Sequence, residues 1–203
     1  MADRKISDLT ALTTPASGDF LPIVDISEAA AASKNKRITI EELFRGTPDG
    51  TAALPSVCPE SDPNTGIFSP GADQWGIASN GTERWRITSD GVLARGQGAP
   101  VAVNATATLT VADLKSGIIT STTAAAVTAT LPTGTLTEGG FTSIYTNFSF
   151  EWNVINTGAT NTFTVQAGTG HTLVGSGAVA ANQAVRFLSR RTAANTFVSY
   201  RLS

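Results

Sequence analysis

Turn-forming residues recur about every ten residues along the second half of the chain, and this spacing constrains the fold more than any other sequence feature. The turn clusters lie at 157–161, 167–170, 175–177 and 193–195. Short strands joined by tight turns at this spacing are typical of sandwiches and barrels, for which about 100 residues suffice. We therefore expect residues 101–203 to form a C-terminal antiparallel β-sandwich domain.

The strongest strand pattern lies at residues 148–154, where every even position is apolar. Strict alternation predicts a strand with one face buried and the other exposed. Val198, Tyr200 and Leu202 alternate in the same way and predict another half-buried strand. The other candidate strands of this domain cover residues 107–111, 117–121, 127–131, 162–166, 172–174 and 184–190.

Residues 47–100 are dense in turn-forming pairs and predict a short, shaft-like segment of β-hairpins. Asn80-Gly81 and Asp90-Gly91 are the strongest pairs, because type I′ hairpin turns need a positive φ at both central residues. They set off two candidate strands, at 74–78 and 84–88.

A single hairpin is marginally stable in water, and the sequence offers no helix to cover the tryptophans of this one. Trp85 and Ile87 share one face of the second strand by alternation. Three-fold intertwining of identical chains would cover these side chains. We therefore expect a homotrimer, with contacts that include Trp75, Ile77, Trp85 and Ile87.

Residues 1–46 carry small apolar groups that are too scattered to bury one another. The first group has the spacing of one helical turn, and the others lie in two short extended stretches. Burial of six aliphatic side chains on a partner could give on the order of 10 kcal/mol before ordering costs. We expect an extended N-terminal anchoring arm that docks through Ile6, Leu9, Leu12, Leu21, Ile23 and Ile38.

Charge is scarce and unevenly distributed. Only 15% of the residues are charged, whereas typical soluble domains have about 25%. The net charge of −2 argues against a nucleic-acid partner, which needs a basic patch. No run of about 18 apolar residues is present, and the N-terminus leads into no apolar signal region. We therefore expect no membrane partner and synthesis in a cytoplasm.

Few residues could carry catalytic or metal chemistry. Glu138 and Glu151 are the only glutamates after residue 100, and no pattern pairs them as glycoside hydrolysis requires. His171 is the only histidine and Cys58 the only cysteine, which disfavours a histidine-based metal site and excludes an intrachain disulfide. A G-x-S-x-G motif is absent. We predict no enzymatic activity, no catalytic residue, no metal and no cofactor.

Arginines gather on the last two candidate strands. Arg186, Arg190 and Arg191, together with Arg201, could form a contact patch for an acidic surface polysaccharide. The alternative is that they form ion pairs between subunits or lie on a solvated face.

Residues 5–12, 19–25 and 36–39 resemble the N-terminal arm of phage fibre and virion-surface proteins. Residues 66–71 and 80–91 resemble the shaft repeat of phage tail fibres. Residues 153–158, 167–170 and 195–197 resemble a β-sandwich module of cyanophage and related phage structural proteins.

The resemblance implies a homotrimer on the virion surface, bound to the major capsid protein or to tail subunits, after assembly in the host cytoplasm. The chain is short and has a single shaft-like segment, which favours a capsid cement or decoration protein that stabilises the shell and displays an outward sandwich. The alternative is a short tail or head fibre, an adhesin whose C-terminal domain binds host surface glycans.

Overall fold

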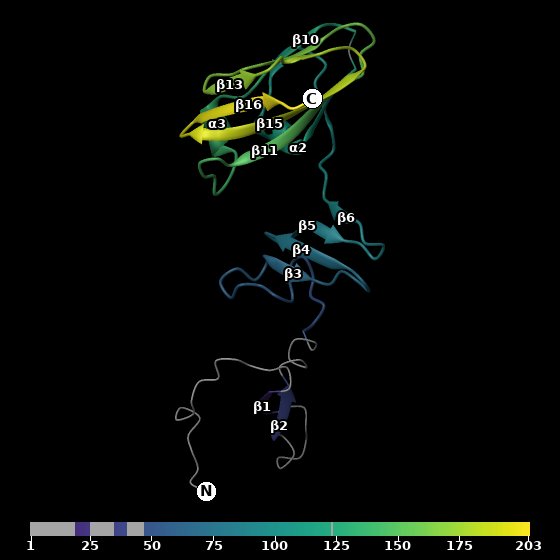
Figure 1. The fold of residues 1–203 in the computed structure, drawn as a ribbon, viewed down its shortest axis with the longest axis vertical. Coiled ribbons are helices and arrows are strands. Elements are labelled where there is room, and N and C mark those ends of the chain that lie inside the picture. The colour runs from purple at the N-terminus through teal and green to yellow at the C-terminus, as the bar shows by residue number, and fades with distance from the viewer. Residues whose placement is uncertain (1–18, 25–34, 40–46, 123) are drawn as a thin grey trace. The chain divides into compact units, whose positions relative to one another are not determined.

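A computed structural model describes residues 19–24, 35–39, 47–122 and 124–203. The described residues are mainly β-strand, and the chain divides into two compact units, Met1–Gly96 and Gln97–Ser203 (Figure 1). The second unit begins just before the predicted start of the sandwich domain. The end of the predicted arm, at residue 46, lies outside the described residues.

Two strands of the first unit form an antiparallel pair, β1 (Phe20–Val24) with β2 (Asn35–Thr39). Leu21 lies opposite Ile38, and Ile23 lies two residues further along the same strand. Because directly paired residues and alternate residues share a face, Leu21, Ile23 and Ile38 lie on one face of this small sheet. The two extended stretches predicted here are confirmed. The predicted helical turn at residues 6–12 lies outside the described residues.

Four further strands of the first unit form an antiparallel sheet in the order β3-β4-β5-β6. Asn80 (φ 52°) and Gly81 (φ 68°) both have a positive φ between β4 and β5, as the predicted tight turn requires. The strands are β3 (Gly66–Phe68), β4 (Trp75–Ser79), β5 (Thr82–Ile87) and β6 (Leu93–Arg95).

The two-residue turn predicted at Asp90-Gly91 is wrong. Of this pair only Gly91 has a positive φ, 80°, and both residues lie in the longer loop between β5 and β6. Thr88 shapes this loop, because its hydroxyl oxygen accepts a hydrogen bond from the Val92 amide (3.0 Å) and its hydroxyl donates to the Asp90 carboxylate (2.5 Å).

The second unit consists of two sheets that lie on either side of an apolar core (Figure 1). The six-stranded sheet has the order β13-β16-β15-β11-β9-β7, and the four-stranded sheet has the order β14-β12-β10-β8. The strands are β7 (Val101–Ala102), β8 (Ala107–Thr108), β9 (Ile118–Ser121), β10 (Val127–Thr130), β11 (Ser149–Asn156), β12 (Phe163–Gln166), β13 (His171–Val174), β14 (Ala178–Val179), β15 (Gln183–Ala193) and β16 (Thr196–Arg201).

Both sheets of this unit are mixed, which corrects the prediction of an antiparallel sandwich. From β7 to β12 the chain alternates between the two sheets and so winds as a flattened coil. Each strand from β9 to β12 therefore pairs in parallel with the strand two places earlier in the chain. Only the β11-β15-β16 and β12-β14 pairs are antiparallel. Side chains alternate with a period of two in both kinds of sheet, so periodicity could not distinguish them.

The core confirms the alternation predicted around residue 150. Trp152 and Val154 are fully buried, and the Trp152 ring stacks on Phe187 with centroids 4.6 Å apart. The Trp152 Nε1–H donates to Ser189 Oγ (3.0 Å), which is also hydrogen-bonded to Ser199 Oγ (2.8 Å). The polar atoms introduced by this strand and its neighbours are therefore satisfied inside the core.

The face predicted to be buried on the last strand is wrong. In β16 the buried side chains are Phe197 and Ser199, while Val198 and Tyr200 lie on the outer face and Leu202 is exposed. Ser199 can be buried because Ser189 satisfies its hydroxyl. Hydrophobic alternation predicts that the face with Val198 and Tyr200 is buried, but the opposite face, which includes the small polar Ser199, lies in the core.

Two short helices, α2 (Val111–Ser116) and α3 (Gly134–Gly139), were not predicted. Helix α2 begins where the strand at 107–111 was expected to continue. Thr110 and Asp113 form a capping box, in which the Thr110 hydroxyl oxygen accepts from the Asp113 amide and the Asp113 carboxylate accepts from the Thr110 amide. This local pairing satisfies amides at the helix start and favours a helix over a longer strand.

A buried histidine lies at the start of β13. The His171 ring stacks on Phe197, and its Nε2 lies 3.0 Å from Thr137 Oγ, whose own hydrogen is donated to the Thr133 carbonyl. Nε2 therefore carries the ring hydrogen, and Nδ1 has no partner. Burial lowers the pKa of His171 to about 4, because a second ring proton would be buried without an acceptor.

We expect the protein to lose stability as the pH falls from 7 to 4.5. The unfolded chain protonates His171 near pH 6.5, whereas the folded chain resists protonation down to about pH 4. The unfolded state therefore binds more protons in this window, and the free energy of unfolding should fall by roughly 2–3 kcal/mol. Denaturant unfolding at several pH values measures this change. His171→Phe keeps the ring stacking and removes the titration, so an equally steep fall in that variant would contradict the assignment.

Candidate interaction surface

The two faces of the β3-β4-β5-β6 sheet differ sharply. On one face Phe68 and Ala78 are buried, and the Phe68 ring lies so close over Gly76 that a Cβ there would be 2.6 Å from it. On the same face Arg86 donates two hydrogen bonds to the Glu83 carboxylate (2.7 and 2.6 Å), which lower the pKa of Glu83. The chain itself therefore covers this face and satisfies its polar groups.

The opposite face is apolar and uncovered within the described part of the chain. Two rows of paired residues cross it, one through Ile67, Ile77 and Trp85 and the other through Trp75, Ile87 and Leu93, and Arg95 ends the first row on β6. Val57 extends the first row through a bridge to Ile67. We name Val57, Ile67, Trp75, Ile77, Trp85, Ile87 and Leu93 the apolar face.

The side chains of the apolar face are large and well exposed. Trp75 is 59% exposed, Trp85 42% and Leu93 64%. The seven residues together expose on the order of 700 Å², which exceeds the largest apolar patch of a typical monomer and approaches the area that one partner buries in a stable complex. Trp75, Ile77, Trp85 and Ile87 thus lie together on this face, and their role as trimer contacts stays a prediction. Val57, Ile67 and Leu93 were not predicted, because only the register of the strands places them on this face.

Three of the six predicted anchoring residues lie together on the β1-β2 pair. Leu21 (41%) and Ile23 (42%) are exposed, and Ile38 opposite Leu21 is half-buried. These three side chains form a second, smaller apolar surface. Ile6, Leu9 and Leu12 lie outside the described residues.

The arginines predicted to form one patch are divided between the faces of the six-stranded sheet. Arg186 and Arg190 lie on its outer face, alternating with the buried Val185, Phe187 and Ser189. Arg186 lies 3.7 Å from the Glu151 carboxylate, and both side chains are about half exposed. Arg191, by contrast, belongs to an internal network.

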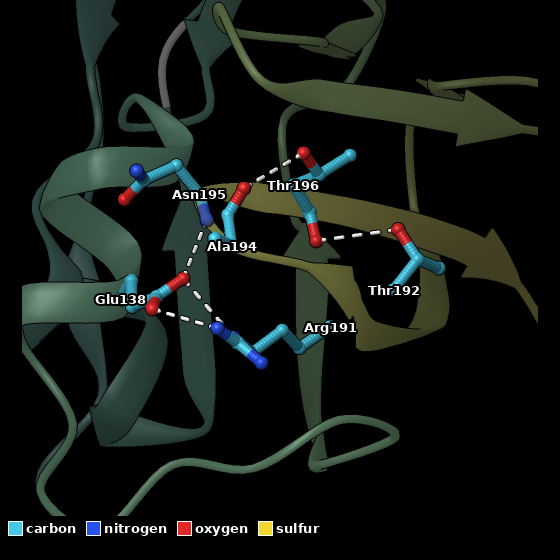
Figure 2. A network of polar contacts seen from close by, with 6 residues as sticks. All are labelled: Glu138, Arg191, Thr192, Ala194, Asn195 and Thr196. Atoms are coloured by element: carbon cyan, nitrogen blue, oxygen red, sulfur yellow. Dashed lines mark hydrogen bonds and ion pairs between the residues drawn. The ribbon is translucent and has the colours of Figure 1, made fainter.

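Figure 2 shows this network, in which Glu138 joins α3 to β15 and to the turn between β15 and β16. The Arg191 guanidinium donates to both oxygens of Glu138 (3.0 and 2.8 Å), and the Asn195 amide donates to the same carboxylate (2.5 Å). These hydrogen bonds, first those from Arg191, lower the pKa of Glu138. Glu138 and Arg191 are thus structural partners of each other, whereas Glu151 pairs with Arg186.

The remaining chemistry-bearing residues are dispersed. Cys58 is an exposed free thiol. Within residues 19–24, 35–39, 47–122 and 124–203, no three His, Cys, Asp or Glu side chains gather as metal ligands would. Over the same ranges, no helix combines the length and apolar character needed to span a bilayer. Comparison with family models, with curated proteins and with solved structures finds no match to the chain.

Proposed function

We propose that this chain is a non-enzymatic structural protein of a bacteriophage virion. It forms a homotrimer that docks on the outer capsid by its N-terminal arms, as a cement or decoration protein. The trimer stabilises the shell and displays the C-terminal sandwich outward. The resemblance of three chain segments to phage structural proteins supports the virion role.

The observation that carries the proposal is the apolar face. Its exposed area is close to what a stable interface needs, and two tryptophans stand at its centre, the residue type most enriched at interface hot spots. A neighbouring copy carries the same surface, so a closed ring of three copies covers every apolar face without requiring another protein.

The smaller apolar surface of Leu21, Ile23 and Ile38 supports docking by the arm. One such patch gives weak binding, but three arms on one trimer raise the effective concentration of each and make the attachment durable.

Removal of residues 1–46 tests the docking role. We expect the truncated protein to remain soluble and trimeric, because the apolar face is retained, but to be absent from purified particles. Full-length protein expressed in parallel is the control, and both are quantified in gradient-purified virions by mass spectrometry. Incorporation of the truncated protein at the full-length level would overturn the proposed docking.

A further inference from the structure

The outer face of the six-stranded sheet carries a guanidinium group with no carboxylate partner among the described residues. The Arg190 side chain donates from Nη1 to Asn147 Oδ1 (2.8 Å) and from Nη2 to the Tyr200 phenol oxygen (3.2 Å). Both acceptors are neutral, so they orient the guanidinium without cancelling its charge. A guanidinium has five N–H donors, and these two bonds leave others free for a ligand.

The other arginines of this unit are occupied differently. Arg191 is paired with Glu138, and Arg201 donates to backbone carbonyl groups of Ser176, Ala178 and Ser203. Residues 97–203 contain five Lys and Arg against three Asp and Glu, so this unit is net positive although the whole chain carries −2. Arg186, on the same outer face, lies 3.7 Å from the Glu151 carboxylate, so Arg190 is the arginine of this face that has no carboxylate partner among the described residues.

The surroundings of Arg190 combine an aromatic ring with aliphatic surface. Tyr200 is half-buried on the same outer face, directly opposite Leu188 on one side and Val174 on the other. Val198 lies directly opposite Arg190. The cation thus stands at the border of a small apolar platform, with the Asn147 amide on its other side.

We propose that Arg190, Tyr200 and Asn147 form a binding site for an acidic saccharide, a sugar that bears a carboxylate. The guanidinium binds the carboxylate through paired N–H groups, which is the geometry that arginine and carboxylate share. The C–H face of the sugar ring packs on Tyr200, and the Asn147 amide hydrogen-bonds a hydroxyl. Because Asn147 and Tyr200 already hold Arg190 in place, binding loses little side-chain entropy.

This inference goes beyond the structural role, because the site lies within one chain and requires neither trimer nor capsid. A trimer would present three such sites, and a polymeric saccharide could engage them together. The site would then let a virion protein adhere to acidic polysaccharide.

Titration calorimetry of the full-length protein with a galacturonic acid oligomer tests the site. We expect saturable binding at millimolar concentration or below, and binding weaker by about 10-fold or more to the methyl-esterified oligomer, which has the same backbone but no charge. Absence of binding to the acid form, or equal binding of the ester, would overturn the proposal.

Substitutions then assign the binding to Arg190. Arg190→Gln should weaken binding of the acid oligomer by about 10-fold or more. Arg190→Lys keeps the charge but loses the paired N–H donors, so its affinity should lie between those of the Gln variant and the native protein. Arg84→Gln removes the same charge from an exposed position of β5 and should bind like the native protein. Unchanged binding by a folded Arg190→Gln variant, judged by circular dichroism and melting temperature, would contradict the assignment.

Discussion

Replacement of Trp85 by glutamate is expected to dissociate the proposed trimer into monomers while each chain stays folded. Trp85 is 42% exposed in the single chain and lies in the middle of the apolar face, opposite Ile77. In a trimer the substitution buries three unpaired carboxylates, each of which costs several kcal/mol. The protein concentration at which half of the trimer has dissociated should therefore be about 100-fold or more higher for the variant than for the native protein. Analytical ultracentrifugation measures this concentration.

Ser89→Glu is the matched control, because it adds the same charge in the exposed loop between β5 and β6. This variant should remain a trimer, and both variants should keep the circular dichroism spectrum of the native protein. A Trp85→Glu protein that stays trimeric would show that the apolar face does not hold the copies together.

Trp152→Ala is expected to lower the free energy of unfolding of the second unit by about 3–5 kcal/mol. The Trp152 side chain is fully buried, stacks on Phe187 and donates a hydrogen bond to Ser189. Its removal leaves a large cavity and takes away the hydrogen bond to the Ser189 hydroxyl. Chemical denaturation monitored by circular dichroism measures the loss.

Tyr145→Ala is the matched control for an aromatic residue of the same unit. Tyr145 is 65% exposed and contacts Phe148 edge-on, so its loss should cost less than about 1 kcal/mol. If Trp152→Ala and Tyr145→Ala destabilised the protein equally, Trp152 would not be the centre of the core.

The strands of the second unit could largely be predicted from sequence, whereas their arrangement could not. The alternation around Trp152 is a local property of the chain, and the structure confirms it. The parallel pairing of β9 with β11 depends on how the chain winds between two sheets, which turn spacing does not report. The outer face of β16 was misassigned because Ser199 is buried through a hydrogen bond to another strand.

The short helices were missed for a different reason. Thr110 and Asp113 have capping-box spacing, so the start of α2 was visible in the sequence, but no apolar periodicity of useful length follows it. Neighbouring Thr and Val residues favour a strand by propensity, and the local cap prevailed over that propensity.

The interaction surface was partly predictable. Alternation placed Trp85 and Ile87 on one face, and the Asn80-Gly81 turn fixed the partner strand, which brings in Trp75 and Ile77. Leu93 joins the face only through the longer loop after β5. The arginines of β15 looked like one group in the sequence. Arg190 and Arg191 are consecutive strand residues, however, so alternation turns them to opposite faces of the sheet, and Arg191 binds Glu138.

The mass of the full-length protein in solution tests most directly whether copies of this chain cover each other's exposed tryptophan-bearing sheet. Light scattering coupled to size-exclusion chromatography should give three times the mass of the chain over a range of concentrations. A particle with the mass of one chain, at every concentration up to the solubility limit, would contradict the account.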